Sequence, residues 1–421
     1  MLRKRAYLPA VPISVPLPYT GRIQPLRRLV RIRTVALVLA CAVEIGSLVT
    51  AYALMPTGAR SAAPPAAFKV VGLRSRTIAQ AGREATAALI TTPSPTTTDT
   101  PSPPLPPRPA PRPFPFEAGV NMLVYGNDSG FAAKAAAQLD HLAQLHVNSV
   151  ALVFPIYQAS WTATSVYSDP VSTPSTSNMR TFIRAAHQRH IRVLLRPLLD
   201  EASLHTSGKW RGQIAPSSTG AWFASYTNLV MGYAQLAQAE NVEIIDIGTE
   251  LDSLQSSTQQ WLNLIASVRG VYHGQLTYSA NWAIWYPSFG WALDFLSVDA
   301  FFPLAVPINA SQQQLVAAWG QWVARANGFG YSYGKHVVFT ELGTTAEVGS
   351  FQQPWLWSHG TGISMEAQRL YYAAACQALK GRIGGMYWWE YLLDPVPSAT
   401  ADPGFDPQGK PADLEIGRCY S

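Results

Sequence analysis

The sequence predicts an α/β protein whose folded part is a (β/α)8 TIM barrel, preceded by one transmembrane helix and a disordered Pro-rich stalk. Three observations lead to this prediction. Apolar strand-like runs alternate with helical patterns from residue 116 onward. An apolar run covers residues 34–55, and 11 prolines stand between residues 91 and 115. The 421 residues are enough for one large folded domain or two ordinary ones.

The N-terminal third of the chain carries the features of a membrane anchor. Residues 34–55 form an apolar run long enough to cross a bilayer, which takes about 20 residues. Residues 1–33 hold eight Lys or Arg and no acid, so the positive-inside rule makes them a basic cytoplasmic tail. We expect an uncleaved signal-anchor at the cell membrane, with the following domain extracellular. A cleaved signal peptide, and hence a secreted protein, is the alternative.

The charge is divided unevenly along the chain. Residues 1–115 contain 15 of the 31 Lys and Arg but only 3 of the 25 Asp and Glu, so the remainder is acidic. The basic overall charge is therefore no evidence for a nucleic-acid partner. Residues 56–115, rich in Pro, Ser and Thr, read as an extended linker. The domain that is left covers residues 116–421.

Eight strand-like runs, most of them followed by a helical pattern, justify the barrel. Their continuous apolar character fits parallel strands covered on the outer face. A doubly wound sheet is the structural alternative, but no Gly-rich nucleotide-binding motif follows a strand to support it. The helix after the eighth strand is doubtful, because little after Asp394 looks helical before Pro411. The predicted strands are 118–124, 148–154, 191–197, 242–248, 275–280, 294–300, 336–340 and 382–389. The predicted helices are 130–146, 178–190, 221–240, 258–272, a weak patch at 288–293, 311–327 and 365–380.

Polar side chains and tryptophans follow the predicted strands, where a barrel of this type places its active site. Two strands run into the same Thr-Glu pair, which ends in Glu250 in one case and Glu341 in the other. Indole rings stack on sugar rings, and carboxylates and amides bind hydroxyl groups. This mixture predicts a carbohydrate site. The strand ends that we expect to contribute are Asn121, Arg196, Glu250, Asn281, Trp282, Asp299, Glu341, Trp388, Trp389 and Glu390.

Two carboxyl groups are sufficient to cleave a glycosidic bond. One protonates the leaving oxygen while the other stabilises or attacks the oxocarbenium-like centre. The strands of Glu250 and Glu341 are fourth and seventh of eight, so both side chains can point across the barrel mouth toward one sugar. No cofactor is implied by this chemistry, and no metal-ligand spacing of Cys and His is present.

Seven short motifs in order resemble glycoside hydrolase family 113, of the retaining (β/α)8-barrel clan. The resemblance implies endo-β-1,4-mannanase activity on β-mannan, with Glu250 as acid/base and Glu341 as nucleophile. It also implies that Trp388 or Trp389 lies under the reacting sugar, and that Trp210, Arg211, Asn281, Trp282 and Asp299 hold or shape the substrate site. The motifs are GVN at 119–121, KWRGQIAP at 209–216, IGTEL at 247–251, YSANW at 278–282, SVDAFFPL at 297–304, FTELG at 339–343 and YWW at 387–389.

The chain departs from the clan's pattern at three strand ends. Thr249 stands where an Asn usually precedes the acid/base, and Arg196 begins a segment that lacks the expected His. Phe301 and Phe302 replace a tyrosine that often bonds the nucleophile, so that Tyr278 or Tyr387 would have to supply the hydroxyl. Hydrolysis of another β-glycan, or a catalytically inactive carbohydrate-binding barrel, are the alternative functions.

Several of these residues also have purely structural explanations. Asp246, Asp299 and Arg196 could form ion pairs inside the barrel instead of contacting substrate. Trp388 and Trp389 are adjacent on a strand and must face opposite ways, so one of them at most is the stacking platform. Cys376 and Cys419 are either bridged, which the exported location would allow, or two separate thiols.

Overall fold

The computed structural model describes residues 116–199, 204, 207–396 and 399–421. The predicted cytoplasmic tail, transmembrane span and linker lie outside these residues. Within the described part, no helix is both long enough and apolar enough to span a bilayer.

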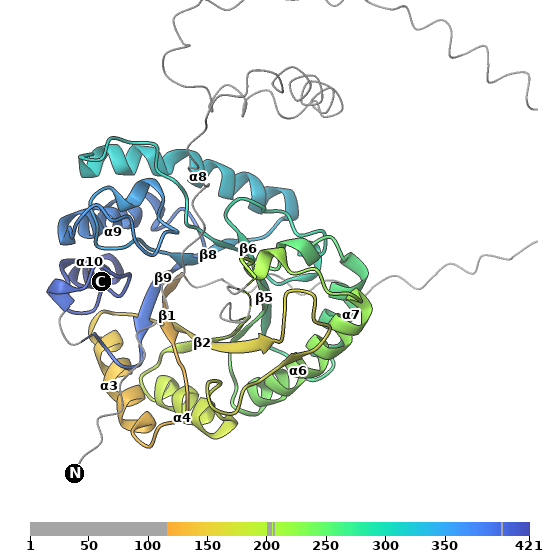
Figure 1. The fold of residues 1–421 in the computed structure, drawn as a ribbon. Helices are drawn as coiled ribbons and strands as arrows, with labels where there is room; N and C mark the ends of the chain where they lie inside the picture. Colours follow the sequence, from red (N-terminus) through yellow and green to blue (C-terminus); the bar gives the residue numbers. More distant parts are fainter. Residues whose placement is uncertain (1–115, 200–203, 205–206, 397–398) are drawn as a thin grey trace, which may run out of the picture. The chain divides into compact units, whose positions relative to one another are not determined.

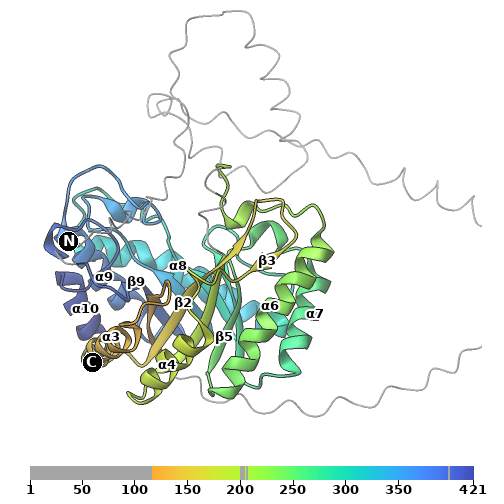
Figure 2. The ribbon, with the colours of Figure 1, turned by 60° about the horizontal axis from the view of Figure 1, so that its bottom comes forward.

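Eight parallel strands in the described part form a closed barrel, which confirms the predicted (β/α)8 barrel (Figure 1). Each strand pairs with its neighbour in the chain, and the last also pairs with the first, at Gly119 and Tyr387 among other positions. The short strand β3 (Val166–Tyr167) pairs antiparallel with the end of β2 and lies at one end of the barrel (Figure 2). The barrel strands are β1 (Glu117–Leu123), β2 (Ser149–Gln158), β4 (Arg192–Leu199), β5 (Ile244–Thr249), β6 (Gln275–Asn281), β7 (Leu296–Asp299), β8 (Val337–Leu342) and β9 (Gly385–Leu392).

Helices surround the barrel on its outer face (Figure 1). The weak helical patch after β6 is a single 3-10 turn, η4 (Gly290–Ala292). The doubtful helix after β9 does form, and it begins at Pro411, a residue suited to the first helical turn. The α-helices are α3 (Phe131–Gln144), α4 (Thr176–His187), α6 (Thr219–Ala239), α7 (Thr258–Arg269), α8 (Gln312–Tyr333), α9 (Met365–Leu379) and α10 (Pro411–Tyr420). Short 3-10 turns also lie at η2 (Arg211–Gln213), η3 (Asp252–Leu254), η5 (Ser350–Gln352) and η6 (Ala399–Ala401).

Local signals in the sequence define the helix ends. Ser311 accepts a hydrogen bond from the backbone N–H of Gln314, whose side chain bonds back to Ser311, forming a capping box at the start of α8. The same helix continues to Tyr333 because Gly334, in the left-handed conformation at φ 63°, ends it. This stop lies beyond the predicted end at residue 327.

Two apolar layers are separated by the strands. The larger one fills the space between the barrel and the helices, and the smaller one fills the barrel interior. The ring of Tyr387 crosses the interior directly over Gly119, where any side chain larger than hydrogen would collide with it. Because both strand faces are buried, the strands read as continuous apolar runs rather than alternating ones.

The last helix fastens the seam between the first and last strands. Cys419 of α10 forms a disulfide with Cys376 of α9, so the first of the two alternatives for these cysteines is correct. The Tyr420 hydroxyl lies 2.9 Å from the carbonyl oxygens of Gly119 in β1 and Met386 in β9. Helix α10 is therefore tied to α9 covalently and to the barrel by hydrogen bonds.

The disulfide should contribute measurably to stability. It closes a loop with a sequence separation of 43 residues, and such a cross-link restricts the unfolded chain. We expect a Cys376→Ser/Cys419→Ser variant to lose about 2–4 kcal/mol of unfolding free energy in urea titrations. Wild-type protein under reducing conditions should show the same loss, and an unchanged midpoint in both would contradict the prediction.

Candidate active site

Four of the polar side chains singled out in the sequence, Glu250, Asn281, Asp299 and Glu341, meet at the C-terminal end of the barrel. Glu250 follows directly after β5, and Glu341 is the penultimate residue of β8. Strand register places Asn281 of β6 beside Asp299 of β7, and Asp299 beside Glu341. These polar side chains from neighbouring strands therefore lie at one level of the barrel.

Glu250 is held on both of its carboxylate oxygens. Oε1 accepts a hydrogen bond of 2.7 Å from the Asn281 amide, and Oε2 lies 2.9 Å from the Arg211 guanidinium. The residue has a φ of +50°, an unusual conformation for glutamate, and its N–H donates to the carbonyl of Ser279. The turn after β5 thus directs the carboxyl group away from the course of the strand.

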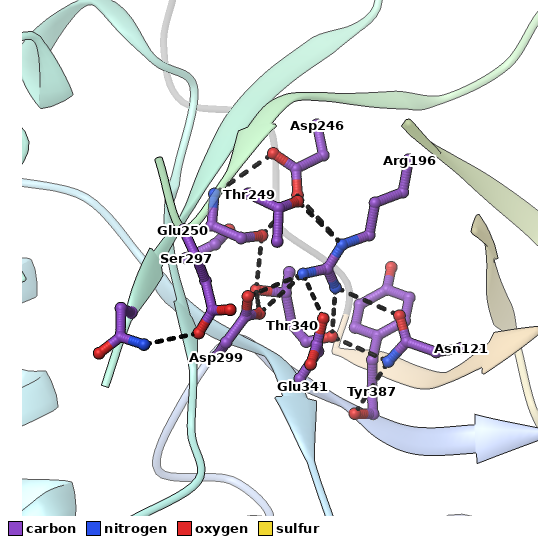
Figure 3. Close-up of polar contacts among 12 residues, drawn as sticks. Asn121, Arg196, Asp246, Thr249, Glu250, Ser297, Asp299, Thr340, Glu341 and Tyr387 are labelled. Atoms are coloured by element: carbon purple, nitrogen blue, oxygen red, sulfur yellow. Dashed lines mark hydrogen bonds and ion pairs between the residues drawn. The ribbon is translucent and has the colours of Figure 1, made fainter. Parts of the chain in front are cut away.

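Glu341 lies against a buried guanidinium. Arg196 Nη2 is 2.7 Å from Glu341 Oε1, and the same nitrogen donates to both oxygens of Asp299 at 2.8 and 2.9 Å (Figure 3). The Arg196 Nε is 3.4 Å from Asp246 Oδ2. A single cation therefore faces three carboxyl groups in the barrel interior.

The remaining polar atoms of Arg196 bond to the barrel itself. Nη1 donates to the side-chain oxygen of Asn121 and to the carbonyl of Thr340, and the Asn121 amide donates to that same carbonyl. Asn121, Arg196 and Asp299 are all fully buried. This placement favours the structural explanation for the three residues over direct substrate contact. Arg196 contacts Glu341, and Asn121 and Asp299 hold Arg196 in place.

Burial dominates the electrostatics of this cluster. It raises the pKa of Glu341 well above its usual range; the Asp299 and Glu250 carboxylates raise it further, whereas Arg196 and Arg211 lower it. Burial also raises the pKa of Asp299 and of Asp246, and in each case Arg196 is the main opposing influence. The two arginines thus favour the ionised form of Glu341 against a buried environment that disfavours it.

Aromatic rings line the barrel mouth beside these carboxyl groups. Trp389 belongs to the interior apolar cluster, together with the partly buried Trp282, Trp355 and Trp357. Trp282 and Trp355 stack with ring centroids 5.0 Å apart. Trp355 and Trp357 were missed in the sequence, although two indoles in the long loop after Glu341 could have suggested them.

Trp388 has a different environment from its neighbour. It is fully buried and stacks on Tyr372 of α9, with ring centroids 4.2 Å apart, so it faces the helices outside the barrel. Of the two candidates for the stacking platform, the structure brings only Trp389 to the mouth. The prediction of Trp388 as a substrate-binding residue is therefore wrong, because its indole forms part of the packing between β9 and α9.

Trp210 and Arg211 lie in and beside the turn η2. The Trp210 ring covers Gly212, and Arg211 donates from Nε to the Leu199 carbonyl while its Nη1 reaches Glu250. Glu390 is buried near the loop after β9, and burial, followed by Asp406 and Asp402, raises its pKa to about 8. The Glu390 carboxyl therefore forms a second cluster of acidic side chains with Asp402 and Asp406.

Neither Tyr278 nor Tyr387 supplies the tyrosine hydroxyl that was expected beside Glu341. The Tyr387 hydroxyl bonds Ser149 and Glu117 at the opposite end of the barrel. Tyr278 packs edge-on against Trp261 and Phe289 outside it. The group that contacts Glu341 is Arg196 instead. Among the described residues, no group of three His, Cys, Asp or Glu side chains is arranged to hold a metal ion.

The adjacent tryptophans allow a matched test of the site. Trp389→Ala should lower kcat/KM on a glycan substrate by about 10- to 100-fold, as expected for losing about 1.5–3 kcal/mol of aromatic burial against substrate. Trp388→Ala should instead lower the unfolding free energy by about 3–5 kcal/mol, and leave kcat/KM close to wild type while the fold is intact. A larger activity loss in the Trp388 variant would reverse this assignment.

Comparison with solved structures supports the same architecture. A β-mannanase of family 113 from Alicyclobacillus acidocaldarius, solved in complex with ManMIm, aligns with a TM-score of 0.66 and 24% identity over 73% of this chain and 98% of its own. A second β-1,4-mannanase of the family aligns with a TM-score of 0.64 and 24% identity, over 73% and 99% of the two chains. At this identity the similarity establishes the shared fold.

The sequence also matches a family directly. No curated protein sequence matches the chain significantly. The sequence model of Glycoside Hydrolase Family 113, however, matches residues 125–410, which is most of the chain and includes all strands of the barrel after the first. The chain therefore belongs to glycoside hydrolase family 113 and is a glycoside hydrolase.

Proposed function

We propose that this glycoside hydrolase is a retaining endo-β-1,4-mannanase, with Glu250 as the acid/base and Glu341 as the nucleophile. The observation that carries this proposal is the pair of carboxyl groups at the ends of β5 and β8. Each lies within 3 Å of a guanidinium nitrogen, Arg211 for Glu250 and Arg196 for Glu341. Both belong to one electrostatically linked group, since the charge of Glu250 acts on Glu341.

The two carboxyl groups would then divide the reaction as retaining enzymes do. Glu250 donates a proton to the glycosidic oxygen while the Glu341 carboxylate attacks the anomeric carbon, which releases the leaving sugar and forms a glycosyl-enzyme ester. Glu250 next removes a proton from water, which displaces Glu341 and restores both groups. Asn281 and Arg211 orient Glu250 throughout, and Arg196 stabilises the leaving Glu341 carboxylate.

The aromatic lining supports a polysaccharide substrate. Trp389, Trp282, Trp355 and Trp357 give several indole rings beside the carboxyl pair, and such rings bind the C–H faces of pyranoses. The solved family members named above are β-mannanases, which makes β-1,4-mannan the first substrate to test. The third barrel strand lacks the His that the clan usually has there, carrying Arg196-Pro197-Leu198, so the sugar at the reacting position could differ, and another β-glycan is the alternative.

We infer from the sequence that residues 34–55 anchor the enzyme in the cell membrane, with the barrel outside the cell. These residues lie outside the described part of the structure. Fractionation of cells followed by N-terminal sequencing of the mature chain tests the anchor. An intact N-terminus in the membrane fraction supports it, and a mature chain that starts after residue 55 in the medium contradicts it.

The roles of the two glutamates are tested by isosteric substitution. Glu341→Gln should lower kcat on β-1,4-mannan by at least about 10³-fold, because the amide is no nucleophile. Glu250→Gln should lower it by about 10²–10⁴-fold through loss of proton transfer. Glu366→Gln, on the exposed face of α9, is the control and should leave kcat unchanged.

The products decide between the proposal and its alternatives. Manno-oligosaccharides that first appear with retained anomeric configuration, followed by NMR, support a retaining endo-mannanase. Inverted products would remove the nucleophile role from Glu341. Turnover of a different β-glycan would change the substrate, and binding of mannan without product release from any glycan in a panel would indicate an inactive, carbohydrate-binding barrel.

The pH dependence should report the buried position of Glu341. The nucleophile must be ionised, and burial followed by the Asp299 carboxylate raises its pKa above the ordinary value. Activity should therefore fall as pH decreases through this raised pKa, so the acid limb of kcat/KM should lie well above about pH 4.3. A profile that stays flat down to pH 4 would contradict this prediction.

A further inference from the structure

Four buried oxygen atoms form a continuous chain beneath the two glutamates. Ser279 Oγ lies 2.5 Å from Asp246 Oδ2 and 2.8 Å from Thr340 Oγ1. Thr340 Oγ1 in turn lies 3.0 Å from Asp299 Oδ1. The chain runs across the barrel interior through residues of β5, β6, β8 and β7, and all four side chains are fully buried.

The number of protons in this chain is too small if both aspartates are ionised. Three oxygen–oxygen contacts within hydrogen-bond distance need three protons, but the hydroxyls of Ser279 and Thr340 supply one each. Whichever way the two hydroxyls turn, one contact between electron-rich oxygens is left without a proton. In a buried site such a contact is strongly unfavourable. A third proton on one of the two carboxyl groups removes the conflict.

The surroundings indicate which carboxyl group carries this proton. Both Asp299 oxygens face Arg196 Nη2, at 2.9 and 2.8 Å, so protonation there would weaken a direct ion pair. The nearest guanidinium nitrogen to Asp246 is 3.4 Å away, and the shortest contact of the chain, 2.5 Å, is the one at Asp246. With the proton on Asp246, all three hydrogen bonds run in one direction. The Asp246 carboxyl donates to Ser279, the Ser279 hydroxyl donates to Thr340, and the Thr340 hydroxyl donates to Asp299.

We propose that Asp246 is a neutral carboxylic acid in the folded enzyme and acts as a positioning residue for both catalytic glutamates. Its neutrality leaves the single charge of Arg196 to be shared by Asp299 and Glu341, which favours an ionised Glu341. This part of the inference rests on the proposed role of Glu341. Burial raises the pKa of Asp246, with Arg196 as the main opposing influence, in agreement with the proton count.

Asp246 also connects to Glu250 through the end of β5. Its Oδ1 accepts hydrogen bonds from the N–H groups of Gly248 and Ser279, and its Oδ2 accepts one from the Thr249 hydroxyl. Ser279 then receives the Glu250 N–H on its carbonyl oxygen. The titratable or charged groups that face Asp246 are Arg196 and Asp299 within the barrel, and the phenols of Tyr226 and Tyr278 on its outer side.

A pair of isosteric substitutions separates a neutral from an ionised Asp246. Asp246→Asn reproduces the shape of the protonated acid and can donate to Ser279, so the full-length variant should keep an unfolding midpoint close to that of the wild type. Asp299→Asn removes the ionised partner of Arg196 and should lower the midpoint clearly. Equal losses in the two variants would overturn the proposal.

Two further measurements on the same variants report the proton itself. The infrared difference spectrum, wild type minus Asp246→Asn at neutral pH, should contain the carbonyl band of a protonated carboxyl group, and a carboxylate band alone would overturn the proposal. This result holds whether or not the enzyme cleaves mannan.

On an active substrate, the acid limb of the pH profile of kcat/KM should stay at the same pH in Asp246→Asn. A shift to lower pH would show that a negative charge had been removed and that Asp246 is ionised.

Discussion

The buried guanidinium of Arg196 is the interaction on which the rest of the site depends. A lone cation in the barrel interior would be very costly, and so would the carboxyl groups of Asp246, Asp299 and Glu341 without it. Their contacts, together with those of Asn121 and Thr340, give almost every polar atom in this layer a partner. Glu341 is thereby held on a support built from five different strands, which gives the rigidity that the proposed nucleophile would need.

The groups around the barrel opening and the groups that support them lie at different depths in the barrel. The charged layer lies beneath, while Glu250, Trp389 and the indoles of the loop after β8 lie around the opening. Arg211, which comes from the short turn after β4, reaches over to Glu250 from above the strand ends. In this barrel the strands carry the buried charged groups, and the loops carry the side chains around the opening.

The sequence was sufficient to predict the barrel and to place Glu250 and Glu341 at strand ends, because both depend on patterns along the chain. Apolar runs reveal strands, and a carboxylate after such a run is unusual enough to be noticed. The depth of a side chain is a different matter, since it depends on packing between distant segments. Arg196, Asp299 and Asn121 could therefore be located at strand ends but not assigned to a supporting layer. Trp388 and Trp389 show the same limit: their opposite directions were predictable, but the choice between them required the tertiary structure.

The position of α10 has a consequence for the order in which the enzyme is made. Tyr420 and Cys419 secure the seam between β1 and β9, and in the chain they follow all eight strands of the barrel. Until β9 has been synthesised, the edge of β1 that later pairs with it has no covering strand, and such an edge is prone to pair with other chains. Synthesis of this barrel therefore includes an interval in which nearly the whole apolar sheet exists but remains open.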